Sequence, residues 1–181
     1  AAVWARENTR EAIFDAMMRK ETYATTGTRI RVRFFGGRGF VAEDAQRRDL
    51  AQIGYAKGVP MGGDLAYPLS RGADVESGVA PAPTFIIWAA KDPEGANLDR
   101  LQIIKGWVAD GKPHEAVFDV ACSSGDPDPA THRCADNGAS VDLTTCAFSK
   151  DVGASELRGV WHDPAFNASQ HAVYYVRALE N

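Results

Sequence analysis

Hydrophobic and polar side chains alternate most regularly at residues 29–35. Arg29, Arg31 and Arg33 fall on one face of an extended segment there, and the apolar residues between them fall on the other. The alternation predicts a half-buried β-strand. Three cations on one face could hold a phosphate or a carboxylate, but the solvent-exposed face of an antiparallel sheet gives the same pattern. We favour the exposed sheet face.

Two stretches carry helical patterns. The first predicts a helix over residues 9–20, with Asn8 supplying a side-chain acceptor at its start and Glu11 reaching back as in a capping box. The residues that share its apolar stripe are Ile13, Ala16 and Met17, with Phe14 and Met18 at its edge. A second, shorter helix is predicted over residues 45–56 and ends before the Gly-Val-Pro that follows.

The second half of the chain has the pattern of repeated short strands. Runs rich in β-branched or aromatic residues, separated by turn-forming residues, lie at 84–90, 101–105, 116–121, 157–161 and 173–179. Asp92 to Gly95 predicts a turn between the first two runs. Short strands without helices between them are typical of an antiparallel β-sandwich. The predicted fold class is therefore α+β and mainly β, with one or two helices before the sandwich.

Composition and charge narrow the function classes. With 181 residues, 45% of them hydrophobic and 24% charged, the chain has the composition of a folded domain. Its formal net charge of −4 argues against a nucleic-acid partner, because such binders normally present a basic surface. The longest apolar run, at 85–90, is far shorter than the roughly 20 residues of a membrane-spanning helix. We expect neither a nucleic-acid partner nor a membrane span.

Cys122, Cys134 and Cys146 are evenly spaced in a stretch rich in Asp, Pro, Gly and Ser. Loops of this composition gain stability from cross-links, so we expect one disulfide among the three, with its pairing open. Free buried thiols rank second. A zinc site ranks last, because it normally needs paired short spacings such as C-x-x-C. A disulfide would place the protein in an oxidising compartment, so we expect export to the periplasm or beyond.

No motif in the chain carries hydrolytic chemistry by itself. The four histidines show neither H-x-H nor H-E-x-x-H spacing, so we expect no metal site in this chain. Ser123 and Ser124 lack the G-x-S-x-G pattern of a nucleophilic hydrolase. The glycines at 36–39 lack the Lys and Ser or Thr of a phosphate-binding loop and are interpreted as a turn.

Five segments of the chain form one set: WARENTRE at 4–11, ETYATTGxRI at 21–30, GYAKGVPMGGDL at 54–65, KDPxGANLDR at 91–100 and YYVR at 174–177, where x is a position outside the match. Together they resemble a known family, the domain of unknown function 3604. The similarity covers nearly the whole chain. The stretch between Cys122 and Cys146 departs most from the family pattern.

The resemblance implies a relation to the polymerase and histidinol phosphatase superfamily, whose barrel binds divalent metal ions and hydrolyses phosphoesters. The metal-binding motifs of that barrel belong upstream of Ala1, so we expect this chain to be the C-terminal portion of a longer bacterial protein. Its partner would be the N-terminal catalytic part of the same polypeptide, which would hold the metals. On this basis residues 1–35 would end the catalytic barrel, 36–83 would form an irregular connector with a short helix, and 84–181 would form the sandwich.

The same resemblance nominates a first group of site residues. Residues 1–5 would be the last barrel strand, and loops after strands form the active face of such barrels. Glu7, Asn8 and Arg10 could then border the metal centre or contact substrate. Helix capping is the alternative for Asn8, and both interpretations stay open for the other two residues.

A second group of candidate residues follows the first helix. Thr25, Thr26 and Arg29 offer two hydroxyls and a guanidinium after a turn, a set that suits an oxyanion. A polar turn that leads into a strand explains the same residues without any ligand. We favour that second explanation.

Three functions follow as hypotheses. In the first, the chain is an inactive accessory portion of a metal-dependent, phosphoesterase-like hydrolase and shapes or covers its active site. In the second, it is a binding module for a glycan, a polymer or a protein surface, with Trp88, Trp107 and Trp161 as candidate contacts. In the third, free strand edges of the sandwich pair two copies into a homodimer.

Overall fold

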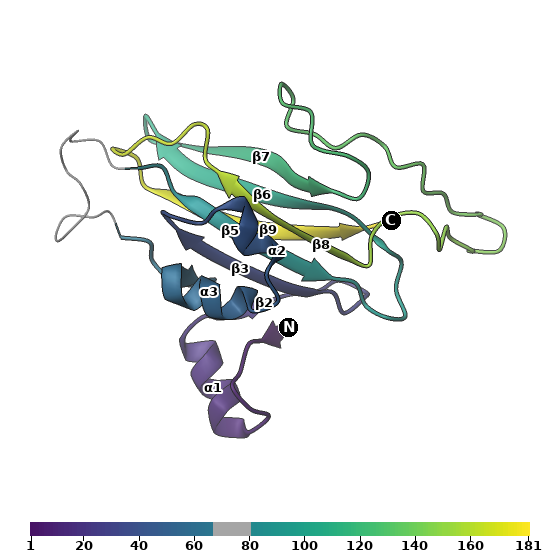
Figure 1. Ribbon diagram of the computed structural model, residues 1–181, viewed down its shortest axis with the longest axis horizontal. Helices are drawn as coiled ribbons and strands as arrows, with labels where there is room; N and C mark the ends of the chain where they lie inside the picture. The colour runs from purple at the N-terminus through teal and green to yellow at the C-terminus, as the bar shows by residue number, and fades with distance from the viewer. Residues whose placement is uncertain (67–80) are drawn as a thin grey trace.

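The protein is a two-layer antiparallel sandwich with a small N-terminal unit attached (Figure 1). The computed structural model describes residues 1–66 and 81–181. The strands are β1 (Ala2–Val3), β2 (Thr22–Tyr23), β3 (Arg31–Gly37), β4 (Gly58–Pro60), β5 (Thr84–Ala90), β6 (Leu98–Ala109), β7 (Lys112–Cys122), β8 (Glu156–His162) and β9 (Ala172–Glu180). The helices are α1 (Arg10–Met18), α2 (Ala42–Gln46) and α3 (Leu50–Lys57).

Two sheets make up the sandwich. One has the strand order β4-β3-β5-β8 and the other the order β7-β6-β9, while β1 and β2 form a separate pair. Every one of these pairings is antiparallel. The predicted fold class, mainly β and α+β with an antiparallel sandwich, is confirmed. The described residues hold three helices rather than one or two, because the helix predicted at 45–56 is split into α2 and α3.

The hydrophobic core has two compartments. Between the sheets lie inward-facing residues such as Phe34, Ile87 and Ile103. On the outer face of the four-stranded sheet, Phe35 and Ile86 are covered by α2 and α3. Strand β5 is therefore buried on both faces, which explains why its sequence is a continuous apolar run instead of an alternation.

Strand β3 lies in the interior of the four-stranded sheet. It begins two residues later than the predicted segment, at Arg31, and pairs along its whole length with β5. Arg31 is exposed, as predicted for the arginine face. Arg33 is half-buried, with its guanidinium carbon 3.5 Å from the centre of the Trp4 ring. The division of the chain at residues 35 and 83 stays a prediction, and residues 67–80 of the predicted connector lie outside the described residues.

The strands of the second sheet are longer than the sequence predicts. β6 and β7 form one hairpin, and their turn places Asp110 and Gly111 at positive φ, as a tight two-residue turn requires. The turn predicted from Asp92 to Gly95 is present, since the Gly95 N–H donates to the Asp92 carbonyl at 3.0 Å. Polar residues near the ends of β6 and β7 hide the full extent of these strands from a search for apolar runs.

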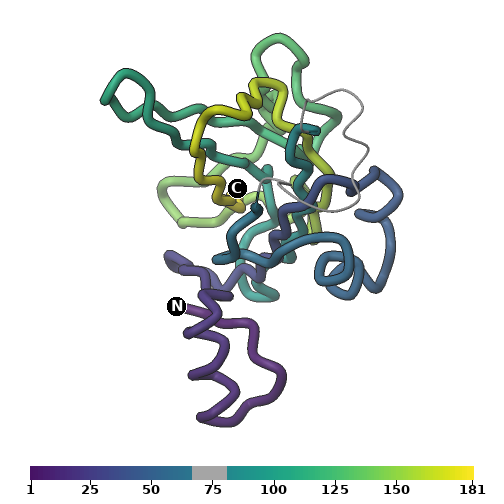
Figure 2. Tube along the Cα trace, turned by 90° about the vertical axis from the view of Figure 1, so that its left-hand side faces the viewer, coloured from purple at the N-terminus to yellow at the C-terminus, as the bar shows by residue number. Residues whose placement is uncertain are grey.

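The N-terminal unit projects from the sandwich and consists of α1 and the β1–β2 pair (Figures 1 and 2). The helix cap is Thr9, whose Oγ1 accepts a hydrogen bond from the Ala12 N–H at 3.3 Å, so the predicted cap at Asn8 is wrong by one residue. Trp4 Nε1 donates to the Val32 carbonyl at 2.7 Å and anchors the unit to β3.

Candidate binding groove

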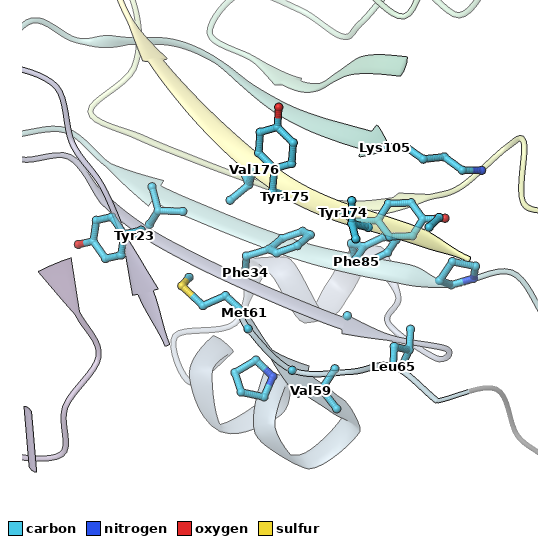
Figure 3. Close-up of a pocket in the computed structure, with 18 of the residues that line it drawn as sticks. Tyr23, Phe34, Val59, Met61, Leu65, Phe85, Lys105, Tyr174, Tyr175 and Val176 are labelled. Atoms are coloured by element: carbon cyan, nitrogen blue, oxygen red, sulfur yellow. The ribbon is translucent and has the colours of Figure 1, made fainter. Parts of the chain in front are cut away.

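A groove of about 1140 Å³ opens between the two sheets on the side of β9 (Figure 3). On the opposite side the sheets close, because β8 packs against β7 with the Trp161 and Phe118 ring centres 4.9 Å apart. On the groove side, β9 faces β3, β4 and the segment that follows β4. The sandwich is thus closed along one long side and open along the other.

The floor of the groove is apolar. Phe34 and Phe85 stack with ring centres 5.4 Å apart, and the Tyr174 ring lies 4.5 Å from Phe85. Met61 and Val176 also line the groove (Figure 3). These side chains share one side because alternate residues of a strand point to the same face.

One wall of the groove is the outer edge of β9. This strand pairs with β6 along one edge, and in the described part of the chain no strand pairs with its other edge. Every residue from 166 to 180 lines the groove. The groove therefore follows both the approach to β9 and the strand itself.

A buried ion pair closes one end of the groove. Lys105 Nζ lies 2.6 Å from Asp163 Oδ2 and 2.7 Å from the Ala165 carbonyl oxygen. The Tyr174 hydroxyl donates to the same carboxylate oxygen at 2.6 Å. Burial, and then the hydrogen bond to the Asp163 carboxylate, raise the pKa of Tyr174 above its ordinary value. These contacts account for the polar atoms at this end without a ligand.

The predicted cluster of Thr25, Thr26 and Arg29 is divided by the fold. Thr25 and Thr26 line the groove, together with Thr28, whose Oγ1 donates to Glu180 at 2.9 Å. Arg29 is not among the lining residues, and its backbone N–H donates to the Asp92 carboxylate at 2.7 Å. The fold therefore places the two hydroxyls at the groove and uses the backbone of Arg29 in the contact between two loops.

The other predicted group, Glu7, Asn8 and Arg10, is exposed and lies outside the groove lining. Glu7 and Asn8 belong to the loop before α1, and Arg10 is the first residue of that helix. The loop lies at the end of the N-terminal unit that is farthest from the sandwich (Figure 1). The two predicted groups are thus not brought together, and their suggested role beside a metal centre stays a prediction.

The structure pairs Cys122 with Cys134 in a disulfide, and Cys146 is free and exposed. The pair joins the end of β7 to the loop that follows it. Asp119 on the same strand accepts hydrogen bonds from Gln102 and from the Cys134 N–H, at 2.7 and 2.8 Å. The disulfide and the carboxylate together hold the start of this long loop against the sheet.

The three tryptophans proposed as candidate contacts lie at separate places. Trp161 is in the aromatic cluster between the sheets, Trp107 stacks on His114 with ring centres 5.4 Å apart, and Trp88 packs beneath the helices. No two of these rings contact each other in the part of the chain that the structure describes. They offer no shared aromatic platform.

Metal ligands and membrane spans can be assessed for residues 1–66 and 81–181. Within these ranges no group of three or more His, Cys, Asp or Glu side chains could hold a metal ion. No helix within them is long and apolar enough to cross a bilayer.

The family model described as "Protein of unknown function (DUF3604)" matches residues 1–181. The chain belongs to this family. Comparison with curated proteins and with solved structures gives no significant match. In this DUF3604 chain, three of the five segments on which the resemblance rests, 21–30, 54–65 and 174–177, meet at the groove. Residues that lie far apart in a DUF3604 sequence therefore form one continuous surface.

The sequence patterns of the DUF3604 chain did not predict the groove or the ion pair at its end. Lys105 and Asp163 belong to separate stretches of sequence, and neither shows a local motif. The free edge of β9 depends on strand order, which periodicity does not report. The one usable signal was the grouping of Tyr174 to Arg177 with two other family segments, because all three contribute to the same surface.

Proposed function

We propose that this chain is the C-terminal accessory portion of an exported, metal-dependent hydrolase that acts on phosphoesters. In this proposal the N-terminal part of the same polypeptide holds the divalent metals. The present chain docks against that part and shapes the surface beside its active site. The observation that carries the proposal is the exposed apolar face of α1.

The helix α1 presents large apolar side chains to solvent. The exposed fractions are 56% for Phe14, 48% for Met17 and 67% for Met18. These residues follow the i, i+3, i+4 spacing of one helical stripe, and such stripes in folded proteins normally pack against another element. The opposite side of the helix faces the N-terminal unit itself, where α1 contacts β1 and Ala16 is fully buried. The face therefore suits a further part of the protein.

The geometry also relates this face to the groove. Lys20 and residues 22–28 follow α1 directly, and nearly all of them line the groove. The segment is held in place by Glu21, which accepts hydrogen bonds from Arg19 and Tyr55 at 2.9 and 2.5 Å. A catalytic part docked on α1 would thus lie next to the groove, which supports a role in shaping the active-site surroundings.

The disulfide between Cys122 and Cys134 supports the proposed export. Structural disulfides persist in oxidising compartments such as the periplasm and are rare in the reducing cytosol.

The test compares the same substitutions in this chain and in the longer polypeptide. Phe14→Glu and Met18→Glu place a charge on the exposed face, and Gln46→Glu on α2 is the control with the same change in charge. In this chain alone, each should change the free energy of unfolding by no more than about 0.5 kcal/mol, because the sites are exposed. In the longer polypeptide, the two α1 variants should lower Tm by several degrees and reduce hydrolysis of p-nitrophenyl phosphate.

Two results would contradict this proposal. One is equal stability of the α1 variants and Gln46→Glu in the longer polypeptide, since the α1 face would then have no partner there. The other is metal-dependent phosphoesterase activity in residues 1–181 alone, which would make this portion catalytic rather than accessory.

A further inference from the structure

The outer edge of β9 is a long, regular strand edge. It spans nine residues, 172–180, and contains neither Pro nor Gly. Its N–H and C=O groups on the groove side have no partner strand within the described residues. Edges of this kind attract a further strand, and proteins normally blunt them with Pro, bulges or inward charges. Apart from Arg177 and the terminal Glu180, β9 carries no charged residue.

The groove beside this edge has the form of a site for one strand. It follows β9 along its whole length, and its floor is made of apolar side chains from the facing sheet. Across from β9 stand residues Val59, Met61 and Leu65 (Figure 3). Because this wall faces the strand, a single extended segment can enter more readily than the edge of a second sandwich.

The charge of the lining indicates what kind of segment fits. Among the lining residues that the structure describes, Lys20, Arg38, Lys105 and Arg177 are cationic, and Asp64 and Glu180 are acidic. The whole chain has the opposite balance, with a net charge of −4. Lys105 is balanced by Asp163, whereas Lys20 and Arg177 are exposed and form no ion pair with any residue of 1–66 or 81–181. An acidic occupant is therefore electrostatically complementary to the groove.

We propose that the groove binds an extended, acidic polypeptide segment of a partner protein by β-strand addition to β9. The main chain of the segment pairs with the free edge of β9. Its alternate apolar side chains rest on the floor around Phe34, Phe85 and Met61. Main-chain pairing supplies affinity in this mode, and the contacts of alternate side chains supply specificity. This inference concerns residues 1–181 alone and does not depend on the proposed hydrolase.

The first test uses a fluorescently labelled probe peptide, Asp-Val-Thr-Val-Thr-Val-Asp, and the full chain. Two control peptides have the same sequence. One is N-methylated at every Val, and the other is N-methylated at the Thr residues between them. Alternate amides of a strand point to opposite edges, so pairing with β9 uses only one set. We expect saturable binding with a Kd of about 100 μM or tighter. One N-methylated peptide should lose at least about tenfold in affinity while the other binds like the parent.

The second test changes the charge of the groove lining. Arg177→Glu should weaken binding of the acidic probe and strengthen binding of a Lys-Val-Thr-Val-Thr-Val-Lys probe. Arg48→Glu, an equal charge change at an exposed residue outside the groove lining, should leave both affinities unchanged. Thermal melting of both variants verifies that they are folded. In hydrogen exchange, the probe should protect amides of 172–180.

Three outcomes would overturn the inference. Equal binding of both N-methylated peptides would mean contact without strand pairing. Protection of amides elsewhere but not in β9 would place the peptide at another surface. A homodimer in sedimentation, with its β9 amides already protected and no binding of the probe, would assign the edge to a second copy of the chain.

Discussion

The ammonium group of Lys105 lies 2.6 Å from the carboxylate of Asp163, and the two side chains are only 3% and 0% exposed. Lys105 is in the middle of β6, whereas Asp163 follows β8 directly. The pair therefore fixes the connection between β8 and β9 against the second sheet. Because Tyr174 donates to the same carboxylate, the pair also fixes the position of β9 at the end of the groove.

Lys105→Met should destabilise the fold strongly. The substitution removes the counter-charge of a buried carboxylate, and breaking one partner of such a pair typically costs about 3–5 kcal/mol of unfolding free energy. Urea denaturation measures this loss. Arg47→Gln, at the exposed pair of Arg47 and Asp49, is the control and should cost less than about 1 kcal/mol. Equal losses in the two variants would contradict the structural role given to Lys105.

Tyr174→Phe should change how stability depends on pH above neutrality. The pKa of Tyr174 is raised in the folded state, first by burial and then by Asp163, whereas an unfolded tyrosine has a pKa of about 10. Above that pH the unfolded chain loses a proton that the folded chain keeps, so the wild type loses stability. Near pH 8 the variant should be less stable by about 1–3 kcal/mol, because a partly buried hydrogen bond to the Asp163 carboxylate is lost.

Urea midpoints measured from about pH 8 to pH 11 test the Tyr174 prediction. The difference between wild type and Tyr174→Phe should shrink as the pH rises through this range. A constant difference would show that the phenol does not titrate differently in the folded and unfolded chains.

Gly54→Ala should destabilise the protein although alanine is the better helix former. A Cβ at Gly54 in α3 would meet the Phe35 ring at 2.5 Å, closer than any normal contact. Phe35 is 1% exposed and has little room to move. We expect a net loss of about 1–3 kcal/mol from overpacking, measured by thermal melting. Gly39→Ala is the matched control, since nothing lies within 4 Å of its Cβ position, and its Tm should stay close to that of the wild type.

The double substitution Cys122→Ser with Cys134→Ser should lower the free energy of unfolding by about 3 kcal/mol. The disulfide closes a loop of 12 residues, and loops of about this size gain that much from a cross-link. Reducing the wild type should give the same loss in urea denaturation. Cys146→Ser should have little effect, because this thiol is free and exposed. A loss in Cys146→Ser as large as that in the double variant would show a different pairing in solution.

Local sequence was sufficient for the strands that stand out as short apolar runs between turn-forming residues. Strand β5 was predicted with its exact ends, and the strands at β8 and β9 were predicted to within one residue at each end. The helix at α1 was also predicted, but its cap was misplaced. Asn8 and Thr9 are both good caps, and only the backbone geometry decides which side chain reaches the Ala12 N–H.

Local sequence did not predict the contacts between separate elements of the fold. The helix predicted at 45–56 became α2 and α3, and Lys57 from the second of them pairs with Asp44 in the first at 2.7 Å. The pairing among the three cysteines was equally open, because even spacing does not favour one partner. The tryptophans illustrate the same limit, since their residue type suggested a common surface and the fold separates them.

By itself, the sequence determined that the chain is mainly β, that it forms an antiparallel sandwich, and that it belongs with the DUF3604 proteins. The first two follow from local patterns, which record the face a segment buries and the turns that end it. The third follows from the resemblance of five segments to that family. The tertiary structure alone decided that β3 joins β5, that β9 is left at an edge, and that the groove opens there. Strand order is set by the free energy of packing whole faces together, and that energy depends on residues far apart in the chain.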